Sequence, residues 1–119
     1  MRKIGISMVL VLLLKGMAFG ESPALKFNAS GKFKIVQFTD VHFKYGNPAS
    51  DIALERIKEV LDAETPDFVI FTGDVIYGRP ADLGMSAVLQ VVADRKIPFG
   101  VVYGNHDNEQ GMSREELLK

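Results

Sequence analysis

The stretch FVIFTGD, residues 68–74, decides the fold of this chain. Its four consecutive apolar residues form a short β-like run, and the Gly-Asp pair after them marks the end of a strand. Two similar runs, residues 33–38 and 99–103, lie on either side of it and are rich in β-branched and aromatic residues. We therefore expect three strands, each of which ends in a polar cluster.

Two helices are expected between these strands, because apolar residues recur there at helical spacing. The first helix has Asn47 or Ser50 as its candidate cap and ends before Pro66. The second starts near residue 81 or 82 and ends before Pro98. The apolar positions are Ile52, Ala53, Ile57, Val60 and Leu61 in the first helix, and Leu83, Ala87, Val88, Val91 and Val92 in the second. This order, β-α-β-α-β, predicts an α/β fold with a largely parallel sheet covered by helices on its faces.

Each strand leads directly into polar residues that can bind cations. Asp40 and His42 follow the first strand, and residues two apart on a strand lie on the same side and can reach one cation. Asp74 follows the second strand and can hold two cations with its two carboxylate oxygens. Asn105, after the third strand, adds an amide oxygen without charge. Because the carboxyl ends of parallel strands meet at one edge of a sheet, we expect these side chains to share one site.

The ligand types and their charges point to phosphate esters. Oxygen and nitrogen ligands without thiolate suit hard or borderline divalent cations. Two such cations, together with the carboxylates of Asp40 and Asp74, leave a net charge of about +2, which attracts a phosphate and stabilises its transition state. Each motif alone has an ordinary explanation, since Asp and Gly-Asp are common in turns and a lone histidine is often structural. Their occurrence together and in order favours the metal site.

The motifs TDVH (residues 39–42), TGD (72–74) and GNHD (104–107) resemble the first three motifs of the calcineurin-like metallophosphoesterases, in particular the purple-acid-phosphatase-related branch. The resemblance covers residues 32–116. It implies a hydrolase acting on phosphoric ester bonds, in which a hydroxide bound to a dinuclear centre of Mn, Zn or Fe attacks phosphorus. It also implies that the chain is the first β-α-β-α-β half of a four-layer α/β/β/α sandwich.

The resemblance further implies a role for each site residue. The implied metal ligands are Asp40 and His42 for the first metal, Asp74 as the bridge, and Asn105 for the second metal. His106 would contact the phosphate or protonate the leaving oxygen, and Asp107 would orient the His106 imidazole. A small phosphorylated molecule is the partner that these roles imply.

Two departures from the family pattern bear on these roles. Purple acid phosphatases bind ferric iron through the Tyr of a Gly-Asp-x-x-Tyr motif, and Tyr77 is the matching residue here. Those enzymes have Gly where this chain has His42, so Tyr77 is either a metal ligand or a wall residue of the site. The family completes its site with three later histidines, and no histidine follows His106 in these 119 residues. We expect the N-terminal part of a longer phosphoesterase domain. The alternative is a non-catalytic truncated remnant with weak or no metal binding.

The first twenty residues have the pattern of a cleaved signal peptide. Arg2 and Lys3 precede an apolar run at residues 4–14, and Ala18 and Gly20 are small at the two positions where a signal peptidase requires small residues. The run is too short to span a bilayer, so no stable membrane anchor is expected. We therefore divide the chain into a signal peptide (1–20), a leader (21–31) and the phosphoesterase portion (32–119). Such a protein is exported to the periplasm, the cell surface or the medium.

The composition excludes other classes of function. With 47% hydrophobic and 24% charged residues, the chain is an ordinary globular sequence rather than a disordered one. Without the three basic residues of the signal, 11 basic residues face 15 acidic ones, and no basic cluster suggests binding to a nucleic acid. The absence of cysteine excludes disulfides, so stability must come from a packed core or a metal.

Overall fold

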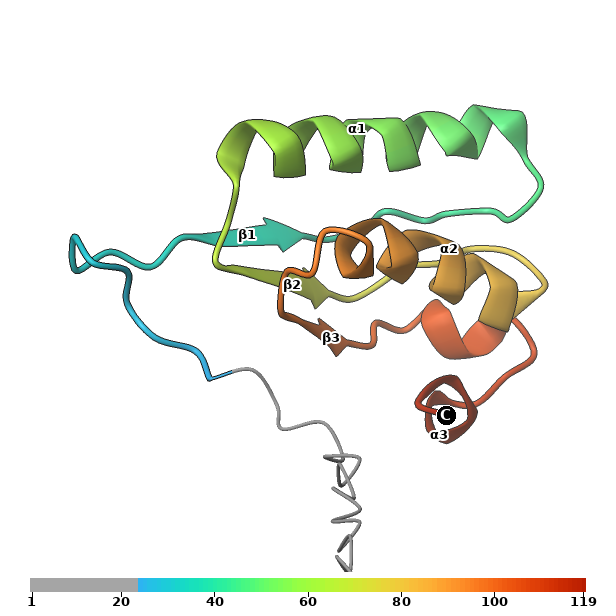
Figure 1. Cartoon of the computed structure of the whole chain (residues 1–119). Coiled ribbons are helices and arrows are strands. Elements are labelled where there is room, and N and C mark those ends of the chain that lie inside the picture. Colours follow the sequence, from blue (N-terminus) through green and yellow to red (C-terminus); the bar gives the residue numbers. More distant parts are fainter. Residues whose placement is uncertain (1–23) are drawn as a thin grey trace, which may run out of the picture.

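The computed structural model describes residues 24–119 as a three-stranded parallel sheet with helices packed against it (Figure 1). The strands are β1 (Ile35–Phe38), β2 (Phe68–Thr72) and β3 (Phe99–Val102), and they lie in the order β1-β2-β3. The connections contain α1 (Pro48–Glu64) and α2 (Ala81–Ala93). A 3-10 turn, η1 (Asp107–Glu109), and the short α3 (Arg114–Leu117) follow β3. The predicted α/β class and element order are confirmed.

Local sequence explains where α1 begins and ends. The Asn47 side chain accepts a hydrogen bond from the Ala49 N–H at 3.0 Å, so Asn47 is the cap. Pro48 occupies the first turn, where its missing N–H costs nothing. The helix ends at Thr65, whose left-handed backbone (φ 43°) turns the chain toward β2.

The core lies between the helices and a single face of the sheet. Val69 and Phe71 of β2 are fully buried and pack with residues of both α1 and α2. The Phe38 ring of β1 stacks on Phe71 with ring centroids 5.6 Å apart. The other fully or nearly buried apolar residues are Phe43, Ile57, Leu61, Val75, Ile76, Ala81, Met85, Val88, Val91 and Val92. Of the apolar positions predicted on the two helices, Ile52 and Val60 of α1 and Leu83 of α2 are exposed instead.

The opposite face of the sheet is open within residues 24–119. Ile35 of β1 is 57% exposed and Val102 of β3 is 56% exposed. Within this part of the chain, the helices therefore cover one face of the sheet, as in one half of an α/β/β/α sandwich. Successive right-handed crossovers that advance in one direction across a sheet place both helices on the same side, and the β1-β2-β3 order has that geometry.

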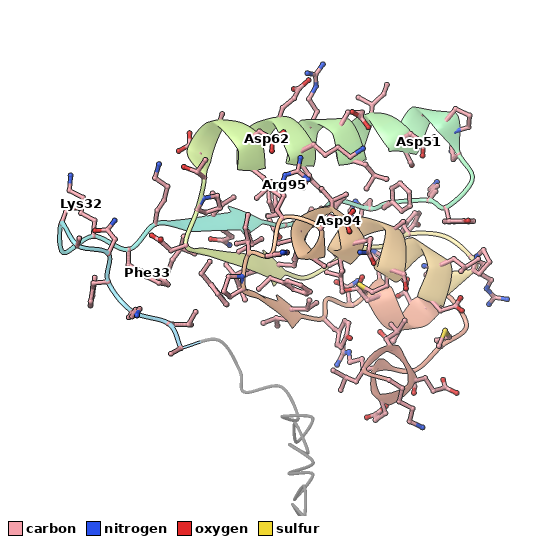
Figure 2. All side chains as sticks on the ribbon, viewed as in Figure 1. Lys32, Phe33, Asp51, Asp62, Asp94 and Arg95 are labelled. Atoms are coloured by element: carbon pink, nitrogen blue, oxygen red, sulfur yellow. The ribbon has the colours of Figure 1, made fainter. Side chains whose placement is uncertain are left out.

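An ion pair joins α1 to the end of α2. The Arg95 guanidinium donates to both carboxylate oxygens of Asp62, at 2.7 and 3.0 Å (Figure 2). These hydrogen bonds lower the pKa of Asp62 below its ordinary value. The pair therefore contributes stability above the usual pKa of an aspartate, and this contribution is lost as the pH falls through the lowered value.

The predicted signal peptide lies outside the described residues, as do the first residues of the predicted leader. Among residues 24–119, no helix has the length and apolar character required to cross a bilayer.

We predict that Leu61→Ala lowers the free energy of unfolding by about 2–5 kcal/mol, because it opens a cavity beneath α1. Leu61 is 1% exposed, whereas Ile52 on the same helix is 60% exposed. Urea unfolding followed by circular dichroism measures the difference. Ile52→Ala is the matched control, and an equal loss in both variants would contradict the packing described above.

Candidate metal centre

The strand ends meet at one edge because the pairing of β1 with β2 continues beyond both strands. The Asp40 N–H donates to the Gly73 carbonyl at 3.1 Å, and the His42 N–H donates to the Asp74 carbonyl at 3.0 Å. The motifs that follow the first two strands are thus held side by side by backbone hydrogen bonds.

Three of the predicted site residues have a left-handed backbone. The φ angles are 53° at Asp40, 50° at His42 and 51° at Asp74, a region that non-glycine residues occupy at an energetic cost. The backbone after β1 is therefore not extended, and the alternation expected to place Asp40 and His42 on one side does not apply. The Asp40 carboxylate accepts a hydrogen bond from the Thr39 hydroxyl at 2.6 Å.

The structure brings together His42, Asp74 and His106. Each contributes one potential ligand atom, and these three atoms lie within 4.8 Å of one another. His42 Nε2 is 3.6 Å from Asp74 Oδ2. Two imidazoles and a carboxylate form a donor set that fits a borderline divalent cation such as Zn²⁺ or Mn²⁺.

The environment of Asp74 keeps its carboxylate ionised. The His106 backbone N–H donates to Asp74 Oδ1 at 3.0 Å, and this bond is the main reason that the pKa of Asp74 lies below its ordinary value. The charges of the His106 and His42 rings lower it further. The ionised carboxylate of Asp74 can bind a cation without first losing a proton, whereas a protonated imidazole must release its proton to become a ligand.

Gly104 permits the close approach of the loops that follow β2 and β3. A Cβ atom at Gly104 would collide with the Asp74 side chain and backbone. A Cβ atom at Gly73, where φ is 111°, would lie 3.0 Å from the Gly104 Cα. Glycine at both positions therefore allows His106 to reach Asp74.

His106 has a carboxylate partner that the sequence reasoning missed. Its Nδ1 atom lies 2.6 Å from Glu109 Oε2, and this contact raises the pKa of His106 above its ordinary value. The two residues are three positions apart: His106 directly precedes the 3-10 turn η1 and Glu109 is its last residue, so the tight winding of the turn brings them together. The signal available in the sequence was the His-x-x-Glu spacing.

Asp107 lies elsewhere than we expected. We predicted that it orients the His106 imidazole, but its carboxylate is fully buried and bonds to backbone groups. Oδ1 accepts from the Ile76 N–H at 3.0 Å and Oδ2 from the Gly104 N–H at 2.7 Å. These bonds tie the loop after β2 to the loop after β3, and Glu109 is the carboxylate that contacts the ring.

Asn105 and Tyr77 lie at the exposed rim of the centre. Asn105 is exposed directly before His106. The Tyr77 ring centroid is 5.0 Å from that of His106 and 5.5 Å from that of His42. Tyr77 therefore borders the group of potential ligands, whether or not it binds a metal.

Comparison with known proteins identifies the family of the chain. The sequence pattern of calcineurin-like phosphoesterases matches residues 33–118. The chain belongs to this family. It is 30% identical over 113 residues to "probable inactive purple acid phosphatase 14" of Arabidopsis thaliana, an alignment covering 80% of this chain and 28% of that protein. It is 38% identical over 104 residues to "phosphatase DCR2" of Saccharomyces cerevisiae, covering 73% of this chain and 18% of that protein.

A bacterial relative shares the same region. The chain is 36% identical over 81 residues to "uncharacterized metallophosphoesterase YkuE" of Bacillus subtilis, covering 64% of this chain and 27% of the relative. The chain thus spans less than a third of the length of these phosphoesterase relatives.

We predict that Glu109→Gln lowers the pKa of His106, because it removes the charge that stabilises the imidazolium. In the native protein the pair stabilises the fold below the usual His pKa of about 6.5, and this contribution is lost as the pH rises through the raised value. NMR titration of the His106 ring measures the shift. Glu115→Gln, an exposed change on α3, is the control; an unchanged His106 pKa in Glu109→Gln would refute the pairing.

We also predict that Asp107→Ala destabilises the protein by about 1–3 kcal/mol for each backbone N–H left without an acceptor. Asp107→Asn keeps one acceptor oxygen, so its free energy of unfolding should fall less than that of Asp107→Ala. Chemical denaturation of the three proteins tests this order. Asn108→Ala changes the exposed neighbour and should leave stability within about 0.5 kcal/mol; comparable losses at both positions would mean that Asp107 does not hold the loops.

Proposed function

We propose that the protein is a metal-dependent phosphoesterase that hydrolyses the esters of small phosphorylated molecules. The observation that carries this proposal is the proximity of two proposed ligands, His42 and Asp74, to the proposed acid His106 at the carboxyl edge of the sheet. One potential ligand atom of each residue lies within 4.8 Å of the others. Membership of the calcineurin-like phosphoesterase family supports it independently.

In this proposal the site takes two cations, of Mn, Zn or Fe. The proposed ligands are Asp40 and His42 for one cation, Asp74 for both, and Asn105 for the other. When bound, the cations supply positive charge for the phosphoryl group and lower the pKa of a bound water. The support for Asp74 is its ionised carboxylate, which has a second oxygen, Oδ2, facing His42.

His106 is proposed to assist departure of the leaving oxygen. Its Nδ1 is held by Glu109, so Nε2 is the ring nitrogen available to a substrate. The raised pKa increases the fraction of imidazolium near neutral pH, which is the form that can donate a proton. The proposed part of Asp107 is to hold the loop after β3, and thereby His106, in place.

A second candidate function is a non-catalytic one. It is favoured by the name of the Arabidopsis relative, "probable inactive" purple acid phosphatase. In that case the three-residue group would bind a cation weakly and support no turnover.

We further propose that the protein is exported. The support is the order of charges and apolar residues at the N-terminus, where Arg2 and Lys3 precede the apolar run at residues 4–14. The mass of the N-terminal peptide of the native protein tests this proposal: a mature chain that starts at Glu21 supports it, and one that retains Met1 contradicts it.

The proposed function predicts that Asp74→Ala abolishes hydrolysis of 4-nitrophenyl phosphate. It also predicts that Mn²⁺ binding weakens by more than about 100-fold, because loss of a residue that only supports a ligand already costs up to about 100-fold in metal affinity. Phosphate release and calorimetry on the native full-length protein measure both quantities. Asp94→Asn, an exposed change after α2, is the control. Metal binding without turnover in the wild type would favour the non-catalytic candidate, and unchanged turnover in Asp74→Ala would overturn the mechanism.

A further inference from the structure

Next to the candidate metal centre, a short parallel β-bridge positions two further side chains. Phe43 pairs with Ile76, and both side chains are buried in the core. The Phe43 carbonyl accepts a hydrogen bond from the Tyr77 N–H at 2.9 Å. The residues that follow the bridge, Lys44 and Tyr77, are exposed next to each other.

Lys44 is anchored more firmly than an ordinary surface lysine. Its N–H donates to the Ser50 hydroxyl at 3.2 Å, and its carbonyl accepts from the Asn47 N–H at 3.2 Å. A Cβ atom at Gly78 would lie 3.3 Å from the Cα, Cβ and Cγ atoms of Lys44, so the lysine stem packs directly on the glycine backbone. These contacts hold the Lys44 backbone and the first two carbons of its side chain.

The Tyr77 ring is a neighbour of both the Lys44 ammonium and the metal centre. Lys44 Nζ lies 5.1 Å from the ring centroid, a cation-π contact. The same ring is 5.0 Å from the His106 ring, centroid to centroid. Among the ion pairs formed by residues 24–119, none includes Lys44, so its charge is not compensated by a carboxylate there.

We propose that Lys44 and Tyr77 form a subsite for a second anionic group of the substrate, on the alcohol side of the phosphate ester. This proposal rests on the proposed phosphoesterase function. The scissile phosphate occupies the centre at His42, Asp74 and His106, the carbon skeleton of the substrate lies along the Tyr77 ring, and its carboxylate or second phosphate reaches the ammonium. The substrate class is therefore a phosphate ester with a second negative charge.

Electrostatics gives the subsite a modest but specific effect. An exposed pair between an ammonium and an anion changes affinity by up to about fivefold, and salt screens it. The tyrosine ring adds a flat apolar surface, which favours a ligand with an apolar part between its two anionic groups.

Matched phosphonates test the proposal without requiring turnover. Calorimetry compares phenylphosphonate with 4-carboxyphenylphosphonate on the native full-length protein in Mn²⁺ buffer at low salt. We expect the carboxylated probe to bind about fivefold more tightly to the wild type and equally well to Lys44→Gln. Lys32→Gln, at the opposite end of β1 (Figure 2), should keep the wild-type preference. Unchanged affinity of phenylphosphonate for both variants shows that the centre is intact.

Variants of Tyr77 test whether its ring contributes to the preference for the carboxylated probe. Tyr77→Phe retains the ring and should retain the preference, whereas Tyr77→Leu should reduce it. Equal affinities of the two probes for the wild type, binding of neither probe, or a preference that survives Lys44→Gln would each overturn the subsite. A preference that depends on Lys44, in a protein that hydrolyses no phenyl phosphate, would support the subsite and overturn only the proposed phosphoesterase function.

Discussion

One buried carboxylate holds together two of the three loops that carry the candidate metal centre. Asp107 accepts an N–H from the loop after β2 and another from the loop after β3, and no solvent reaches it. A charged acceptor with two backbone donors forms strong hydrogen bonds in a buried environment. Because Asp74 lies in the first loop and His106 in the second, their relative position depends on this link.

The polar groups around Asp74 are arranged to favour its negative charge. A backbone N–H and two imidazoles face the carboxylate, and Glu109 holds the His106 ring from behind. The left-handed backbone at His42 and Asp74 is costly by itself and persists because pairing beyond the strands fixes both residues. This rigidity suits a site that must hold its ligands before a cation arrives.

The core and the candidate site lie at different parts of the sheet. One face of it packs on α1 and α2, and the carboxyl edge carries the polar residues, so a change in the core need not alter the site. Within residues 24–119, the open face carries the exposed Ile35 and Val102. In the four-layer arrangement that the family resemblance implies, a second sheet packs on this face.

The sequence by itself determined the strands, the helices, the parallel α/β class and the edge at which the polar clusters meet, because apolar periodicity and capping are local properties. Only the tertiary structure decided which side chains meet. The turn at η1 gives His106 the partner Glu109, burial directs Asp107 to backbone groups, and the left-handed φ at Asp40 breaks the alternation expected from a strand. The bond of Asp107 to Ile76 joins loops distant in sequence, which no local pattern records, whereas the His106–Glu109 pair is a local contact that the His-x-x-Glu spacing could have indicated.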